Sequence, residues 1–231
     1  MADTTPAAVP ADVTTLTARA LLLDMDGTLV DSDAVVDRVW TDWALEHGLD
    51  PRAVLPIVPG RQGHEPMAEL LPHRPMAENH ADNRRMLERE TAETDGIVPV
   101  PGAAAFLAAI ADAPHALVTS ADSALARARM DAAGLRMPHT RVTAEMVSAS
   151  KPDPEGFRTA AAHLGVEPAD CVVFEDSEAG VAAGRAAGMR VVGVGPRAAA
   201  FAPTAHVPTL EHLRTELLPD GTIRLTLLPP A

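Results

Sequence analysis

Residues 24–32 read Asp-Met-Asp-Gly-Thr-Leu-Val-Asp-Ser and directly follow the apolar run Leu-Leu-Leu at 21–23. Such a run predicts a buried strand, so two carboxylates stand one residue apart where the strand ends. Residues i and i+2 of a strand point the same way, and Asp24 and Asp26 therefore aim at one place, while Gly27 lets the backbone turn sharply. Buried carboxylates are costly unless they are paired or bind a metal. An Asp-Gly pair alone indicates a simple turn, but the complete string predicts a catalytic site.

Further polar residues stand where later apolar runs end or just before a helical pattern, namely Thr119-Ser120, Lys151 and Glu175-Asp176. Ligands of open α/β sheets bind at the carboxyl ends of the strands, so we expect these residues to meet the two aspartates at one edge of a sheet. Lys151 is the only lysine, since the other 18 of the 19 basic residues are arginines. A chain with this bias is expected to keep lysine where a compact ammonium is needed instead of a planar guanidinium.

In this order, the motifs resemble those of the haloacid dehalogenase superfamily over residues 21–195. The first motif of that family reads Asp-x-Asp-Gly-Thr-apolar-x-Asp-Ser, and the chain matches it throughout. The resemblance implies that Asp24 is a nucleophile that becomes an aspartyl phosphate. It also implies that Asp26 protonates the leaving oxygen and later takes a proton from the attacking water.

The same resemblance implies a phosphate site and a metal site around the nucleophile. The residues expected at the phosphate are Gly27, Thr119, Ser120 through its main-chain amide, and Lys151. The residues expected at Mg²⁺ are Asp24, Asp176, the main-chain carbonyl of Asp26, and Glu175 directly or through water. Each pair of like charges about 4 Å apart costs roughly 4 kcal/mol at an effective dielectric near 20, so a cation besides Lys151 is required. Oxygen ligands suit Mg²⁺ best.

Short apolar runs alternate with helical patterns from about residue 99 onward, which predicts an α/β fold with a parallel sheet and helices on both faces. The expected strands lie near 18–24, 115–119, 141–143, 171–175 and 190–194, with a further one near 205–207. The expected helices lie near 102–112, 122–133, 154–164 and 178–187. We therefore expect a Rossmann-like, doubly wound core formed by residues 16–32 and 97–231, after a flexible tail at 1–15. Residues 220–227 alternate with period two and indicate an edge strand or an ordered tail.

Residues 33–96 interrupt the alternation of strands and helices. Trp40 and Trp43 stand at helical spacing, and the charged stretch 79–94 is also typical of a helix. An all-helical insert after the first strand resembles the C1 cap of the same superfamily. The segments 30–33 and 95–102 are then expected to be its two hinges.

A Pro- and Gly-rich loop at 56–66 lies inside the insert. Its Gly60-Arg61 pair resembles the substrate-specificity loop of sugar- and polyol-phosphate phosphatases of the superfamily. Arg61, His64 and Glu65 are therefore candidate contacts of the substrate, against the alternative that they are ordinary surface residues.

The chain is acidic, with 32 Asp and Glu against 19 Lys and Arg. This balance argues against nucleic-acid and anionic-membrane partners, which bind cationic patches, and is compatible with a small phosphorylated metabolite. Cys171 is the lone cysteine and lies in a strand pattern, which indicates a buried thiol and a reducing compartment. Residues 1–15 lack the pattern of a signal peptide. We expect a cytoplasmic monomer or weak homodimer.

The sequence thus predicts a Mg²⁺-dependent phosphatase for a small sugar or polyol phosphate. A β-phosphoglucomutase-like isomerase is the main alternative, although such mutases usually carry a histidine where this chain has Val36. A phosphonate hydrolase needs a Schiff-base lysine that the insert lacks, and a haloacid dehalogenase lacks the aspartate found here at position 26. A non-catalytic phosphate-binding protein would be expected to have lost at least one motif residue, and all are present.

Overall fold

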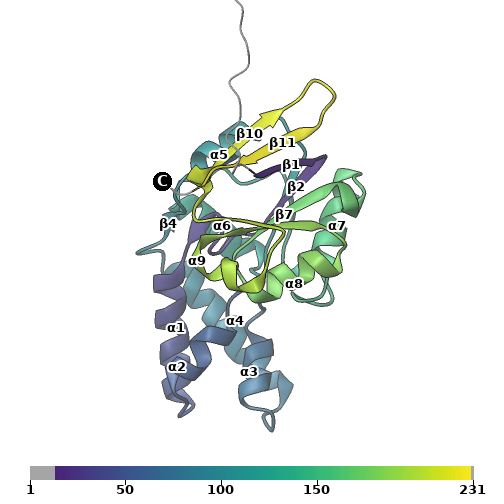
Figure 1. Ribbon diagram of the computed structural model, residues 1–231. Helices are drawn as coiled ribbons and strands as arrows, with labels where there is room; N and C mark the ends of the chain where they lie inside the picture. The colour runs from purple at the N-terminus through teal and green to yellow at the C-terminus, as the bar shows by residue number, and fades with distance from the viewer. Residues whose placement is uncertain (1–13, 230–231) are drawn as a thin grey trace, which may run out of the picture.

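The computed structural model describes residues 14–229, and its centre is a six-stranded parallel sheet (Figure 1). In spatial order the strands are β6 (Thr140–Val142), β5 (His115–Val118), β2 (Ala20–Leu23), β7 (Cys171–Glu175), β8 (Arg190–Val194) and β9 (Ala205–Val207). Leu22, at the middle of the sheet, pairs with Ala116 of β5 and Val173 of β7. The predicted strands after residue 99 are confirmed to within one residue, including the one near 205–207.

Alternate residues of the strands face two separate hydrophobic layers. Leu22 and Val173 pack in one layer with residues of α7 (Glu155–Leu164) and α8 (Glu178–Ala186). Phe174 points into the other layer, where its ring centroid lies 5.0 Å from that of Phe106 of α5 (Ala103–Ala109), near α6 (Ser123–Ala132). Each fully buried side chain of this size stabilises the fold by roughly 1.5–3 kcal/mol. Helices therefore cover both faces, and the prediction of a doubly wound core is confirmed.

A second, three-stranded antiparallel sheet extends one of these layers. It consists of β1 (Thr14–Ala18), β11 (Ile223–Leu227) and β10 (Leu213–Leu217), with β11 in the middle. Ile223 and Leu225 are buried in the layer of Phe106. Residues 220–227, which the pattern indicated as an edge strand or an ordered tail, thus contribute the central strand of this sheet.

The first predicted strand, 18–24, corresponds to β2 but began too early, because Ala18 is the last residue of β1, which belongs to the other sheet. Arg19 separates β1 from β2, and its main-chain amide donates to the carbonyl of Asp170, whereas its guanidinium donates to the carbonyl of Asp220. The expected tail at 1–15 is likewise corrected at its end, since Thr14 and Thr15 belong to β1. The remainder of that tail lies outside the described residues.

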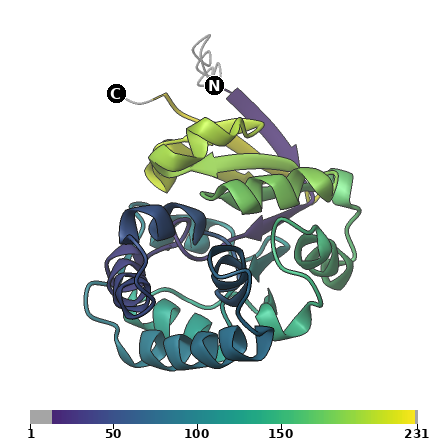
Figure 2. The ribbon, with the colours of Figure 1, turned by 90° about the horizontal axis from the view of Figure 1, so that it is seen from below.

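Residues 33–96 fold as helices and turns. The helices are α1 (Asp33–Glu46), α2 (Pro51–Val54), α3 (His64–Leu70) and α4 (Met76–Ala92), followed in the chain by β4 (Val98–Pro99). Figure 1 shows these helices gathered below the sheet, and Figure 2 views the molecule from that side; we refer to residues 33–96 as the helical insert. The two segments that connect it to the core lie side by side, because β3 (Val30–Asp31) pairs with β4 in a short antiparallel ribbon.

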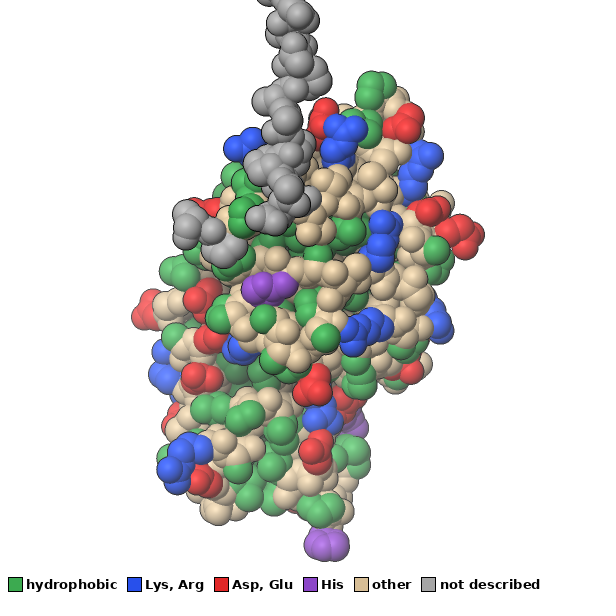
Figure 3. Space-filling view, viewed as in Figure 1, with side chains coloured by type: hydrophobic (Ala, Val, Ile, Leu, Met, Phe, Trp, Pro, Cys, Tyr) green, Lys and Arg blue, Asp and Glu red, His purple; other side chains and the backbone are tan. Residues whose placement is uncertain are grey.

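The surface seen in Figure 3 has acidic and basic side chains interspersed. Within residues 14–229, none of the helices has both the length and the apolar character that crossing a bilayer requires. Cys171 is buried, as expected for a core thiol, and burial raises its pKa to about 11.

The helical insert has a polar anchor at Asp82 of α4. Its carboxylate accepts hydrogen bonds from Trp43 Nε1 at 3.0 Å and from Arg74 Nη1 at 2.6 Å, and His47 Nε2 lies 3.0 Å away. Burial raises the pKa of Asp82, but the hydrogen bonds from Arg74, Trp43 and His47 outweigh it and lower the pKa to about 2. The ionised carboxylate therefore stabilises the insert.

We expect this stabilisation to disappear in acid. Because the pKa falls from 3.8 to about 2 on folding, the stabilisation is complete above about pH 4 and is lost as the pH drops towards 2. It corresponds to about 2 kcal/mol of unfolding free energy, which Asp82→Asn should remove. Urea unfolding at several pH values, followed by the fluorescence of Trp40 and Trp43, measures it. The exposed Asp95→Asn is the control, and a loss in Asp82→Asn that is equal at pH 2 and pH 6 would contradict the expectation.

Candidate active site

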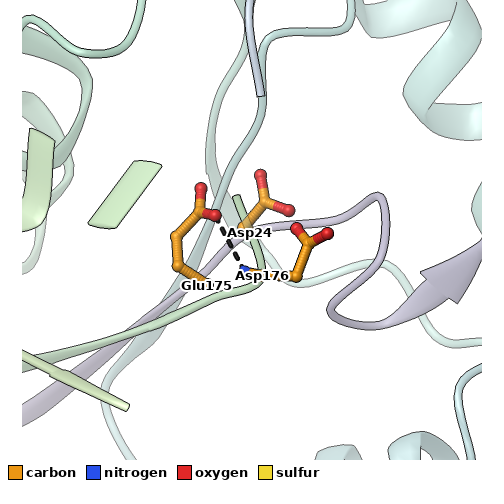
Figure 4. Close-up of side chains that lie close together, drawn as sticks. All are labelled: Asp24, Glu175 and Asp176. Atoms are coloured by element: carbon orange, nitrogen blue, oxygen red, sulfur yellow. Dashed lines mark hydrogen bonds between the residues drawn. The ribbon is translucent and has the colours of Figure 1, made fainter. Parts of the chain in front are cut away.

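The predicted polar groups meet at the carboxyl edge of the parallel sheet, between β2 and β7. From β2 the chain continues to β5, towards one edge of the sheet, whereas from β7 it continues to β8, towards the opposite edge. The gap between β2 and β7 is therefore the crevice where open α/β sheets bind ligands. Asp24 follows β2, Glu175 ends β7, and Asp176 is the next residue (Figure 4). One carboxylate oxygen of each lies within 4.8 Å of the others, and all three residues are buried.

Lys151 joins this cluster from a position 127 residues beyond Asp24. Its Nζ donates to Asp24 Oδ1 at 2.5 Å, to Glu175 Oε1 at 2.6 Å and to the carbonyl of Val118 at 3.2 Å. Burial lowers the pKa of Lys151, but the carboxylates of Asp24 and Glu175 outweigh it and raise the pKa above its ordinary value. The single lysine is therefore a charged ammonium held between two carboxylates.

Glu175 is committed to bonds within the protein. Its Oε2 accepts hydrogen bonds from the main-chain amides of Asp176 and Ser177 and from Ser177 Oγ, each at 2.9 Å, whereas its Oε1 binds Lys151. A Cβ at Gly180 would overlap this carboxylate, so only glycine fits there. This arrangement favours Glu175 as a support of its neighbours and leaves Asp24 and Asp176 as the more available ligands.

The cluster holds more negative charge than its cations balance. Burial, followed by the charge of Glu175, raises the pKa of Asp24 well above its ordinary value. The same two causes raise the pKa of Asp176 to about 7. A divalent cation would lower both values by favouring the ionised forms. Since the available donors are hard carboxylate oxygens, the residues present fit Mg²⁺.

Gly27 lies against the carboxylate of Asp176. Its φ is +81°, a conformation that glycine adopts at little cost, and a Cβ there would overlap the carboxylate of Asp176. Gly27 therefore permits the close approach of the turn after β2 to Asp176.

Asp26 lies beside the cluster and makes contacts of its own. Ser32 Oγ donates to its Oδ1 at 2.7 Å, and Arg129 Nη1 lies 2.8 Å from its Oδ2. Arg129 belongs to α6 and is buried. The sequence analysis missed this arginine, although it stands four residues after Leu125 on the buried face of a helix, and this spacing is the signal that distinguishes it from the exposed Arg127.

Arg197, in the short helix α9 (Gly195–Ala198), is the second residue that the sequence analysis missed. Its Nη2 donates to Asp176 Oδ2 at 2.8 Å, and its guanidinium also lies 3.2 Å from the carboxylate of Asp33, the first residue of α1. The chain shows no signal for this contact, because Arg197 follows a strand whose end carries none of the predicted motifs.

Thr119 and Ser120, after β5, lie at the same edge of the sheet as Asp24, and their contacts with phosphate stay a prediction. Thr119 is buried, and its Oγ1 accepts a hydrogen bond from the amide of Ala121 at 3.1 Å. Ser120 Oγ donates to the carbonyl of Gly60 at 2.7 Å, which connects the core to the loop of the helical insert.

A cavity of about 110 Å³ lies between the core and the helical insert. Its lining includes Asp24, Thr119 and Asp176 from the core and Trp40, Arg61 and Met86 from the insert. Of the three candidate contacts in the insert, Arg61 therefore reaches the cavity. Glu65 accepts a hydrogen bond from Ser150 Oγ at 2.6 Å, beside Lys151, and the ring of His64 packs on that of His80 with centroids 4.5 Å apart.

Comparisons with known proteins agree with this geometry. A model of the haloacid dehalogenase-like hydrolases matches residues 18–188. Hexitol phosphatase A of Escherichia coli (strain K12) is 42% identical over 178 residues, which cover 76% of this chain and 82% of the relative. A fructose-1-phosphate phosphatase of the same organism is 32% identical over 186 residues, covering 75% and 95%. The crystal structure of β-phosphoglucomutase from Clostridium difficile shares the fold, with a TM-score of 0.75, 21% identity, and coverage of 85% of this chain and 93% of that one.

Proposed function

This chain belongs to the haloacid dehalogenase-like hydrolases, and from that membership we propose that it hydrolyses the phosphate ester of a small sugar or polyol that carries no other charge. The proposed reaction uses Mg²⁺ and an aspartyl-phosphate intermediate on Asp24. It is a phosphoric monoester hydrolase, the class of its curated relatives. The observation that carries the finer proposal is that Asp24 and Asp176 line a cavity that the helical insert covers, while Lys151 donates to Asp24 from behind it.

The reaction proceeds in two displacements at phosphorus. In the first, the Asp24 carboxylate forms a bond to phosphorus while the bond to the ester oxygen breaks, and Asp26 gives its proton to the departing alcohol. In the second, a water molecule attacks the phosphorus and Asp26 takes the proton of that water, while the bond between phosphorus and the Asp24 oxygen breaks and inorganic phosphate is released. Lys151 and the hydroxyl of Thr119 contribute mainly by positioning and by charge stabilisation of the phosphoryl group.

The carboxylates of Asp24 and Asp176, with the main-chain carbonyl of Asp26, would hold Mg²⁺, which supplies neutralisation of the phosphate charge and its alignment with the nucleophile. Chelation is therefore expected to stop turnover, and Mg²⁺ to restore it. Ca²⁺ should bind but support less than a tenth of the rate, because it prefers a larger and looser coordination shell. Release of inorganic phosphate in excess chelator, before and after each metal is added back, measures this. Undiminished turnover in chelator would contradict metal dependence.

The charges in the cavity support an uncharged alcohol as the leaving group. Its lining contains three arginines, and each already faces carboxylates: Arg61 faces Glu65 and Glu69, Arg129 faces Asp26 and Glu90, and Arg197 faces Asp33 and Asp176. A second phosphate or a carboxylate on the substrate would have to displace one of these partners. The insert side of the cavity offers apolar surface at Trp40 and Met86, against which the carbon skeleton of a polyol can pack.

A panel of phosphate esters with the purified protein and Mg²⁺ tests the function. Hexitol 6-phosphate and fructose 1-phosphate should release inorganic phosphate with a kcat/KM at least tenfold above that of fructose 1,6-bisphosphate. β-Glucose 1-phosphate should not convert to glucose 6-phosphate at a comparable rate, because Val36, which lines the cavity, cannot transfer a proton. Efficient isomerisation with little phosphate release would favour the mutase and leave the assignment of the nucleophile intact.

A further inference from the structure

Three charged residues, of which Arg129 and Glu90 are buried and Asp26 is partly exposed, form a continuous chain from the reaction centre into the helical insert. Asp26 lies beside the nucleophile, Arg129 lies on α6 of the core, and Glu90 lies on α4 of the insert. Arg129 Nη1 is 2.8 Å from Asp26 Oδ2, and Arg129 Nη2 donates to Glu90 Oε2 at 2.6 Å. The side chains of Arg129 and Glu90 are 4% and 8% exposed, and both residues line the cavity.

Stability does not explain why this position carries charge. The neighbours of Arg129 on the same face of α6, Leu125, Ala126 and Met130, are buried apolar residues. Removing an arginine and a glutamate from water is costly, and apolar side chains often stabilise such a position equally well. Arg129 Nε is, in addition, buried without a hydrogen-bond partner among residues 14–229. The two nitrogens that are bonded point to Asp26 and Glu90, which indicates that the guanidinium serves the contacts at its two ends.

We propose that Arg129 is a positioning residue for Asp26, and that Glu90 makes this positioning depend on the placement of the helical insert. The inference rests on the proposed function, in which Asp26 gives a proton to the leaving alcohol. Arg129 and Ser32 hold the two carboxyl oxygens of Asp26, so the plane of the group is fixed between them. Glu90 holds the other side of the guanidinium only while α4 lies beside α6.

The contact connects proton transfer to closure over the substrate. The insert joins the core through the β3–β4 ribbon, and a displacement of the insert would take Glu90 away from Arg129. Asp26 is then held correctly when the cavity is covered and less well when it is open. Such coupling lets proton transfer begin after bulk water has been excluded.

The leaving group distinguishes positioning of Asp26 from a merely structural role. An alkyl alcohol is a poor leaving group and needs the proton, whereas p-nitrophenolate departs without one. Because kcat/KM covers substrate binding and the first displacement but not the second displacement, it shows how far the first displacement depends on the proton donor. A variant with a misplaced Asp26 should therefore lose rate on alkyl esters selectively.

The experiment measures kcat, KM and kcat/KM of the full chain with Mg²⁺ on the best alkyl ester of the panel and on p-nitrophenyl phosphate. Arg129→Met and Glu90→Gln should lower kcat/KM on the alkyl ester by about 100-fold and about tenfold, respectively, and by less than threefold on p-nitrophenyl phosphate. The loss should lie in kcat more than in KM. Arg129→Lys should recover part of the rate, and adding Glu90→Gln to Arg129→Met should cost nothing further, since Glu90 acts through Arg129.

Matched controls lie on the same two helices, because Arg127 of α6 and Glu88 of α4 are exposed. Arg127→Met and Glu88→Gln should leave both activities unchanged. Equal losses of kcat/KM on the two esters in the folded variants, or a gain of kcat/KM on the alkyl ester, would overturn the inference. If Arg129→Met does not fold, Glu90→Gln and Arg129→Lys decide it, since both keep the polar contacts that their sites require. Failure of the unmodified protein to hydrolyse any ester would instead refute the proposed function.

Discussion

Asp24→Asn is expected to lower kcat by at least about 10⁴-fold while leaving the fold intact, because the amide cannot form the aspartyl phosphate and loss of a catalytic nucleophile has effects of this size. The substitution keeps the shape of the side chain beside Lys151. Steady-state release of inorganic phosphate measures the loss. The variant is expressed in a host that has never carried the unmodified protein, so that no active enzyme contaminates it. A rate above a few per cent of the original would rule out Asp24 as the nucleophile.

The same variant should be no less stable than the original in metal-free buffer. The pKa of Asp24 is raised on folding, mainly by burial and by Glu175, so the ionised form opposes folding above the pKa of the unfolded chain. A neutral side chain removes that opposition at pH 7, and the melting temperature should stay equal or rise. A marked drop would mean that the loss of rate reflects damage to the fold and not the loss of the nucleophile.

Lys151→Met is expected to reduce both activity and stability. Its removal leaves the buried carboxylates of Asp24 and Glu175 without the ammonium between them, and breaking a buried ion pair from one side costs about 3–5 kcal/mol. The rate should fall by at least about 10³-fold, since the charge that balances the Asp24–phosphate pair is lost. Urea unfolding and phosphate release measure the two losses.

Lys151→Arg separates charge from shape. The planar guanidinium keeps the charge but cannot reach Asp24, Glu175 and the Val118 carbonyl from one nitrogen, as Nζ does. We expect it to recover stability better than rate. The exposed Arg127→Met is the control for the loss of a cation elsewhere. An active Lys151→Met enzyme would contradict the role of the ammonium.

The positions of the polar groups at the strand ends could be predicted from the sequence. Each of these groups stands at the end of an apolar run that forms a strand, so the end of the strand places it at the edge of the sheet. Asp24, Thr119 and Glu175 are of this kind, and their convergence follows from the parallel arrangement of β2, β5 and β7. Arg129 and Arg197 differ, because their partners are set by how a helix packs against the core. Spacing along α6 shows that position 129 is buried but not that Asp26 and Glu90 lie on either side of it.

The break between β1 and β2 is a second feature that local pattern does not contain. It falls at Arg19, inside the strand predicted at 18–24, and depends on carbonyls of Asp170 and Asp220, both far along the chain. The place of β11 in the middle of a sheet likewise depends on its two partners, β1 and β10. Alternation predicts a strand at 223–227 and gives no information about which strands lie beside it.

The pairing of β1 with β11 has a consequence for how the protein folds during synthesis. Arg19 and Asp220 are in contact although 201 positions separate them, so β1 leaves the ribosome long before its partner exists. The β10–β11 hairpin forms from neighbouring segments, and β1 must then add to its free side, which is among the slow, non-local steps of folding. Until then β1 has an unpaired edge that can bind other nascent chains. Yield at high expression levels should therefore depend on how fast the last strand pair closes.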